Sequence, residues 1–176
     1  MRLLAYFILA YVTLGLQLGL GHYANFGGAA ANLVLLAVIF IAANAPRDTA
    51  LLGAFSLGLM QDLLGLGPPG LYAMAYGLVA LVVLRTQHSV YRDHPVTHLS
   101  LALAAGLMVA LVVTIHGWAR PAGPKVVEGA VAIAAVRAPV GRLFVSAVYT
   151  AVLAPPVLWM LNRTRRAFAF RTARGW

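Results

Sequence analysis

Long stretches of sequence with few or no charges follow one another along this chain, and they constrain its fold more than any other feature. A helix that crosses a bilayer needs about 20 mostly apolar residues, because no water is present there to hydrogen-bond the backbone. Six stretches come near this length, at residues 3–20, 26–45, 49–66, 70–84, 99–118 and 143–161. We therefore predict an all-α, polytopic transmembrane bundle of six spans.

The composition supports a membrane protein and excludes a water-soluble domain. Hydrophobic residues make up 62% of the 176 residues and charged residues 10%, whereas about a quarter of the residues in a typical soluble domain are charged. A chain of this length is expected to form a single integral membrane domain, residues 1–176, that ends in a basic tail at residues 162–176. Cysteine is absent, which excludes disulfides and thiolate sites.

The positions of lysine and arginine predict the orientation of the spans. Of the 13 basic residues, six spans place nine on the side of both termini and four on the other side. Because basic residues concentrate on the cytoplasmic side, both termini are expected in the cytoplasm, and these residues indicate topology rather than nucleic-acid binding. The apolar run at residues 126–136 is too short to cross. We expect it to form an interfacial or re-entrant helix on the outer face, or else an ordinary loop.

Small residues recur on one face of the third and of the fourth apolar stretch. On the third, Ala54, Gly58 and Asp62 are spaced four residues apart. The fourth carries a stripe with a 3-4-3 spacing, formed by Gly70, Ala73, Gly77 and Ala80. Such stripes let helix backbones approach closely, which is a main source of helix association in a bilayer. A tight glycine–proline turn joins the two stretches, so we predict a helical hairpin.

Asp62 is the only carboxylate inside a predicted span. A charge at bilayer depth costs at least about 2.5–3.5 kcal/mol unless it is paired or close to the interface, so Asp62 needs a partner. It could form a proton or cation site, or a polar contact with another subunit. Alternatively it locks the hairpin, by accepting hydrogen bonds from the N–H groups of Gly65 or Gly67, or by facing the positive N-terminal end of the next helix.

The first stretch contains a GxxxG pattern at Gly15 and Gly19, with Gln17 between them. This pattern is a recurrent helix-packing face and could be the seam of a homodimer. The alternative is packing within the chain, with Gln17 hydrogen-bonded to a neighbouring helix. Asn32, near the start of the second stretch, is likewise expected to bond within the bundle.

Five arginines are interleaved with aromatic residues at the C-terminal end, and they are Arg163, Arg165, Arg166, Arg171 and Arg174. Arginines near a membrane surface are attracted to anionic lipid head groups by about 1 kcal/mol each. We expect the tail to contact these lipids, with the docking of a cytoplasmic partner as the alternative.

The sequence lacks the minimum parts of an enzyme site. No serine, histidine and aspartate occur with a recognisable local signature, and no phosphate-binding glycine loop is present. His94 and His98 have a spacing that can share a metal on a helix, but Pro95 between them interrupts such a helix. We therefore expect no catalytic residues, no metal site and no cofactor.

The third and fourth stretches together resemble the signature of the rod shape-determining protein MreD family. The matching positions are Gly53, Phe55, Gly58-Leu59, Gln61-Asp62, the glycine–proline turn and Gly70-Leu71-Tyr72. The length, the six apolar segments and the basic tail are also similar to that family. The structural or partner-binding motif expected here comprises Gly53, Gly58, Gln61, Asp62, Gly65, Gly70, Tyr72 and Gly77.

The resemblance implies a non-enzymatic scaffold of bacterial cell elongation and peptidoglycan synthesis, embedded in the inner membrane. Such a subunit would bind MreC directly and connect MreB to RodA and its penicillin-binding transpeptidase. The resemblance also implies a fold similar to the substrate-binding S components of vitamin transporters. A vitamin-binding transport subunit that uses Tyr72, Tyr76 and Asp62 is therefore the alternative function, although likeness of fold does not transfer function.

Overall fold

The computed structural model describes residues 3–23, 29–65, 68–86, 95–119 and 140–164. These residues form six α-helices and no strand, which confirms the predicted all-α class. The helices are α1 (Leu3–Tyr23), α2 (Leu33–Asn44), α3 (Arg47–Leu64), α4 (Leu71–Thr86), α5 (Pro95–Ala119) and α7 (Val140–Thr164). The apolar run at 126–136 and the tail arginines beyond Arg163 lie outside the described residues.

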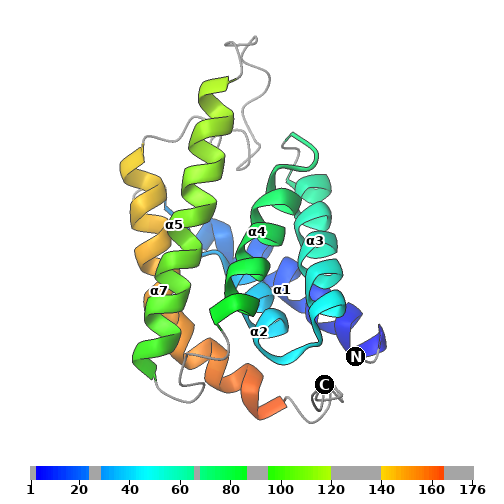
Figure 1. The fold of residues 1–176 in the computed structure, drawn as a ribbon. Helices are drawn as coiled ribbons and strands as arrows, with labels where there is room; N and C mark the ends of the chain where they lie inside the picture. The colour runs from blue at the N-terminus through cyan, green and yellow to red at the C-terminus, as the bar shows by residue number, and fades with distance from the viewer. Residues whose placement is uncertain (1–2, 24–28, 66–67, 87–94, 120–139, 165–176) are drawn as a thin grey trace.

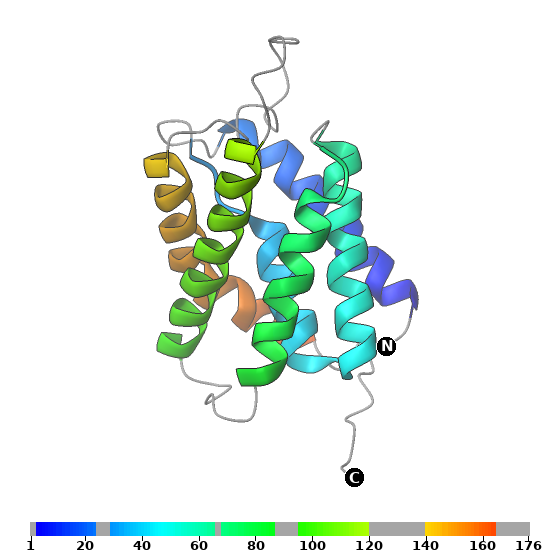
Figure 2. The ribbon, with the colours of Figure 1, turned by 45° about the horizontal axis from the view of Figure 1, so that its top comes forward.

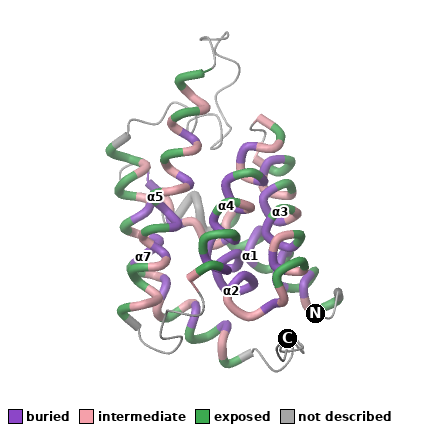
Figure 3. The backbone as a smooth tube through the Cα atoms, in the orientation of Figure 1, coloured by how far each residue is buried: buried purple, intermediate pink, exposed green. Residues whose placement is uncertain are grey.

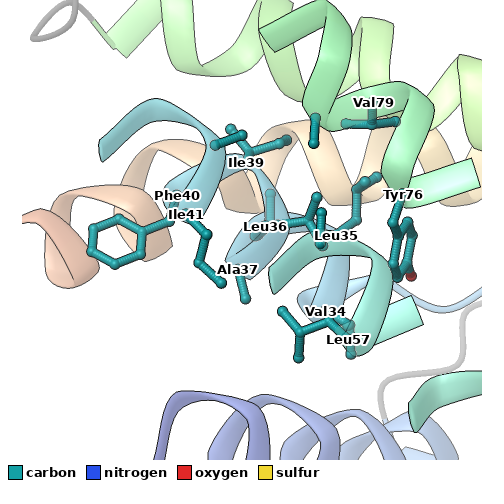
Figure 4. Close-up of a cluster of buried hydrophobic side chains, with 14 of the residues drawn as sticks. Val34, Leu35, Leu36, Ala37, Ile39, Phe40, Ile41, Leu57, Tyr76 and Val79 are labelled. Atoms are coloured by element: carbon teal, nitrogen blue, oxygen red, sulfur yellow. The ribbon is translucent and has the colours of Figure 1, made fainter. Parts of the chain in front are cut away.

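Helix α2 is the centre of the bundle, and the other five helices pack around it (Figure 1). Its residues 34–42 are all buried, so the helix has no face turned to the surroundings. Their side chains radiate into the neighbouring helices, where Leu57 of α3 and Tyr76 and Val79 of α4 belong to the same cluster (Figure 4). The core of the protein therefore follows the axis of α2.

Two helix pairs and one single helix surround α2. Helices α3 and α4 form an antiparallel hairpin on one side, and α5 and α7 lie side by side on the other (Figures 1 and 2). A Cβ built on Gly106 of α5 would lie 2.9 Å from the Cβ of Ala147 of α7, so glycine sets the approach of that pair. Helix α1 is the single helix, and it packs mainly against α2.

The outward faces of the helices are exposed (Figure 3), and many of the exposed positions carry large apolar side chains. Tyr11 of α1 is 81% exposed, Leu52 of α3 72% and Met74 of α4 65%. Apolar exposure of this extent over several helices is expected where lipid surrounds a protein. Two helices, α5 and α7, are long and apolar enough to cross a membrane, and the apolar parts of α1, α2 and α4 are shorter.

Helix α2 begins at Leu33, whereas the hydropathy of the second stretch suggested a start at Phe26. Residues 29–32 lead into the helix in a non-helical conformation. The cause is Asn32, whose side-chain oxygen accepts a hydrogen bond of 2.9 Å from the backbone N–H of Leu35 and so caps the helix. The resulting helix rises only about 18 Å, which is less than the roughly 30 Å thickness of a hydrocarbon core.

Helix α7 contains two adjacent prolines, Pro155 and Pro156. A proline inside a helix lacks the N–H that would bond to the carbonyl four residues earlier, and its ring clashes with the preceding turn, so the helix bends. The part of α7 that follows turns away from the axis of its first part and runs across the end of the bundle (Figures 1 and 2). We call residues 155–164 the C-terminal limb of α7.

Candidate functional site

The carboxylate of Asp62 closes the turn between α3 and α4. Its Oδ2 accepts hydrogen bonds from the N–H groups of Gly70 at 2.9 Å and of Ala73 at 3.2 Å, and its Oδ1 accepts one of 3.0 Å from Tyr72. These amides lie at the start of α4, where a helix has no internal partners for them and its dipole favours negative charge. Asp62 is only 3% exposed. The expectation that it faces the N-terminal end of the next helix is confirmed.

The backbone of this turn is adapted to the carboxylate. Gly70 has a φ of +91°, a left-handed conformation that residues with a side chain rarely adopt. The other expected donor, Gly65, gives its N–H to the carbonyl of Gln61 at 2.8 Å and so caps the end of α3. Gly67, the third glycine considered, lies outside the described residues. The turn therefore supplies the first amides of α4 to Asp62 rather than the last amides of α3.

Gly58 sets the distance between α3 and α4. A Cβ at this position would lie 2.5 Å from the Cα of Ala73, 2.5 Å from the carbonyl oxygen of Tyr72 and 2.6 Å from the nitrogen of Ala73. All three are backbone atoms, so no side-chain adjustment could make room. The small-residue face of α3 is thus occupied by α4 of the same chain.

The remaining glycines of the expected motif differ from Gly58 in what they face. Gly53 is buried, with the side chain of Ile41 3.3 Å from an added Cβ, and its carbonyl accepts a hydrogen bond of 3.1 Å from the hydroxyl of Tyr6. Gly77 has no atom within 4 Å of an added Cβ. On α4 the inward positions of the stripe are Ala73 and Ala80, which are fully buried, while Gly77 is open.

A second polar cluster holds the non-helical entry to α2, and we call it the polar seam. It is formed by Gln17 of α1, Asn32, Gln61 of α3, Tyr76 of α4, and Ser146 and Thr150 of α7. Gln17 both donates to the carbonyl of Ala31 at 3.0 Å and accepts from the N–H of Leu33 at 2.7 Å. The expected hydrogen bonding of Gln17 within the chain is confirmed.

Helix α7 contributes two hydroxyls to the other side of the polar seam. The hydroxyl of Ser146 donates to the carbonyl of Ala30 at 2.6 Å, and the N–H of Asn32 donates to the hydroxyl of Thr150 at 2.8 Å. Non-helical backbone at membrane depth persists only where protein groups replace the lost helical hydrogen bonds. Side chains of α1 and α7 supply these hydrogen bonds to the backbone of residues 30–33.

Tyr76 connects the entry of α2 to the α3–α4 hairpin. The side-chain amide of Asn32 donates to the hydroxyl of Tyr76 at 2.8 Å, and that hydroxyl donates to Oε1 of Gln61 at 2.6 Å. Tyr76 is fully buried and stands beside Tyr72, with 5.7 Å between the ring centroids. The expectation that Asn32 bonds within the bundle is therefore confirmed. Tyr76, Ser146 and Thr150 were not recognised from the sequence as parts of the seam, although hydroxyls four residues apart in an apolar stretch are a detectable signal.

We expect the change Tyr76→Phe to lower the stability of the bundle by about 1–2 kcal/mol, because it leaves the half-buried amides of Asn32 and Gln61 without their shared partner. The midpoint of thermal unfolding in detergent, followed by tryptophan fluorescence, should fall by roughly 2–8 °C. Tyr11→Phe is the matched control, since the ring of Tyr11 is exposed on α1. Equal midpoints for the two variants would show that the polar seam contributes no stability.

The GxxxG face of α1 points away from the bundle. Gly15 and Gly19 are both exposed, and neither has an atom within 4 Å of an added Cβ. Large apolar side chains on the same face, among them Tyr11, Val12 and Leu16, are also exposed. Gln17, by contrast, turns inward, and within the described part of the chain nothing packs against the two glycines.

The described part of the chain holds no group of three or more side chains that could bind a metal ion. His98 lies in the first turn of α5, while His88 and His94 are outside the described residues. Both carboxylate oxygens of Asp62 accept hydrogen bonds from amides at the start of α4. The polar groups at the hairpin turn and in the polar seam are therefore paired with one another.

Comparison with protein families identifies a match over most of the chain. The sequence model described as rod shape-determining protein MreD matches residues 1–164. No curated protein and no solved structure matches the chain significantly. The matched region contains every described helix.

Proposed function

Because the chain belongs to the MreD family of rod shape-determining membrane proteins, a family not known for enzymes, we propose that it is a non-enzymatic scaffold of bacterial cell elongation. In this role it binds MreC, a partner in the same shape-determining system, and through it connects MreB with RodA and the penicillin-binding transpeptidase. The observation that carries the proposal is that the inward and outward faces of the helices differ in their side chains. The bundle's inward polar groups hold the helices together, and its outward faces are apolar and free for partner helices or lipid.

We propose that all six helices lie in the bacterial inner membrane, with both termini in the cytoplasm. Successive helices of the ribbon run in alternating directions (Figure 1). Arg47 at the start of α3, Arg85 near the end of α4 and Arg163 near the end of α7 lie at one end of the bundle, and Arg142 lies at the other. This distribution supports the proposed orientation. A fold shared with the S components of vitamin transporters stays a prediction.

The surface proposed for MreC is the outer face of α1. The hairpin was the first candidate, but the small-residue face of α3 is filled by α4 around Gly58. Gly15 and Gly19 instead leave a shallow, unoccupied strip along α1, a helix that packs mainly against α2 and contacts α3 through Tyr6. Two glycines four residues apart allow a second membrane helix to approach closely. We propose that a membrane helix of MreC occupies this strip.

We expect the double change Gly15→Leu and Gly19→Leu to reduce co-purification of MreC by about tenfold or more, because the added side chains keep the partner helix away. The fold should persist, since both positions are open and leucine is a better helix former than glycine. Gly77→Leu is the matched control, because it adds the same side chain at an equally open position on α4. Cell rounding should accompany the loss of MreC.

The outcome for the control decides which face is used. If Gly77→Leu removes MreC and the α1 variant does not, the partner binds at α4 and the proposed surface is wrong. If the α1 variant instead changes the mass of the purified chain alone, measured by light scattering, the strip is the seam of a homodimer. Full co-purification of MreC with both variants would reject a role for either open glycine face.

The alternative, a vitamin-binding transport subunit, has less support. Tyr76 and Asp62, which would have to contact a substrate, are buried and hydrogen-bonded within the chain. A substrate would have to break these bonds before it could bind. Purification of the protein with a bound vitamin would nevertheless favour the transport function.

A further inference from the structure

The C-terminal limb of α7 has an exposed strip that the scaffold function does not use. Leu158 and Leu161 face the bundle and are 4% and 9% exposed, while Trp159 and Met160 are 63% and 58% exposed. The limb reaches this position because of the bend at Pro155 and Pro156, which takes it across the end of the bundle (Figure 1). One side of the limb is therefore anchored in the core, and the other faces outward.

The position of the bend along α7 places this strip near the membrane surface. Residues 140–154 rise about 22 Å at 1.5 Å per residue, so the prolines follow after most of a hydrocarbon core of about 30 Å has been crossed. The carbonyls of Ala151 and Val152 lose their helical partners at the prolines, and such groups are best tolerated where protein or water can reach them. The oblique limb therefore begins near the boundary between the acyl chains and the head groups.

The exposed residues of the limb are those that favour the head-group region. The guanidinium of Arg163 lies 5.8 Å from the ring centroid of Trp159, a cation–π contact. Tryptophan is enriched at membrane interfaces, and arginine side chains extend from apolar surroundings towards phosphate groups. A tryptophan and an arginine held together on a fixed helix form a unit that matches the boundary between acyl chains and head groups.

The positive charge of this region favours lipids with anionic head groups. Residues 129–176 contain no acidic residue, and four further arginines follow Arg163. Arg47 and Arg85, which are both exposed, lie at the same end of the bundle (Figure 1). A strip that mixes apolar side chains with basic charge fits an anionic bilayer surface. We propose that the C-terminal limb of α7 lies in the head-group layer and that its Trp159–Arg163 pair binds anionic phospholipids.

The test uses the full-length protein in nanodiscs of phosphatidylcholine mixed with phosphatidylglycerol. Trp118 and Trp176 are replaced by phenylalanine so that Trp159 is the only tryptophan. We expect phospholipids brominated near the head-group end of the acyl chain to quench Trp159 more than those brominated near the chain end. Aqueous acrylamide should quench it weakly.

A second measurement addresses the charge. We expect Arg163→Gln to lower the ratio of phosphatidylglycerol to phosphatidylcholine bound at the limb about fivefold, which corresponds to the loss of about 1 kcal/mol. The ratio is measured from the quenching of Trp159 by brominated phosphatidylglycerol. Arg163→Lys is the control that keeps the charge and should keep the preference.

Three results would overturn the proposal. Free access of acrylamide to Trp159 would mean that the strip faces the cytoplasm and is open to a protein partner. Strongest quenching from the bilayer centre would place the limb inside the hydrocarbon. An equal preference for phosphatidylglycerol in the Arg163→Gln and Arg163→Lys variants would show that Arg163 does not select anionic lipid.

Discussion

Replacement of Gly58 by alanine is expected to prevent the α3–α4 hairpin from closing. The new methyl group would lie 2.5 Å from backbone atoms of Tyr72 and Ala73, a separation that real Cβ atoms essentially never show. The two helices would have to move apart, which would also weaken the contact of Asp62 with the start of α4. We expect a loss of about 3 kcal/mol or more, the upper range for overpacked sites. The measurement is the yield and the thermal unfolding midpoint of the detergent-solubilised chain.

Gly77→Ala serves as the control for this prediction. It makes the same chemical change on the partner helix, but no atom lies within 4 Å of the added methyl group. Alanine is favoured over glycine in a helix by up to about 1 kcal/mol, so this variant should be as stable as the original chain or more stable. A Gly58→Ala variant that unfolds at the same temperature as Gly77→Ala would show that the close helix crossing does not exist in the protein.

The second large effect is expected for Asp62. The change Asp62→Leu leaves three amides at the start of α4 without an acceptor, one of them in a buried and two in a half-buried position. Charge-assisted hydrogen bonds contribute about 1.5–3 kcal/mol each and are not additive, so we expect a total loss of about 3–5 kcal/mol. Asp62→Asn keeps one acceptor oxygen and should lose less. Thermal unfolding of the purified chain, without MreC, is the measurement that separates this effect from partner binding.

Asp48→Asn provides the comparison, because Asp48 lies in the exposed first turn of α3. A carboxylate at such a position contributes about 0.3–1 kcal/mol through the helix dipole. Retention of the unfolding midpoint in Asp62→Leu, together with loss of MreC, would contradict a structural role and return Asp62 to the class of partner contacts. A small effect of Asp48→Asn beside a large effect of Asp62→Leu would support the hairpin lock.

Much of the candidate site was predictable because its spacing is local. Ala54, Gly58 and Asp62 share a helix face by periodicity alone, and the structure buries all three. The need of Asp62 for a partner followed from the cost of a bare charge in lipid. The amides at the start of the next helix were among the partners considered, since only a short turn separates them from Asp62.

The polar seam was less predictable, because its members come from distant parts of the chain. Gln17, Asn32 and Thr150 meet only after α1 and α7 have packed on either side of α2. Hydropathy also missed the late start of α2, since Asn32 and its flanking alanines do little to interrupt an apolar stretch. The capping bond to Leu35 depends on the conformation of the backbone around Asn32, which a hydropathy average does not contain.

The six apolar stretches along the sequence were sufficient to identify a helical membrane protein, because transfer of apolar side chains to lipid depends on composition more than on neighbours. The sequence did not determine which helix packs against which face. Gly58 and Gly15 lie in similar glycine-containing stretches, yet one is closed by α4 and the other is open. Lipid competes with every apolar face, so close packing and hydrogen bonds select the helix pairs, and both exist only in the assembled bundle.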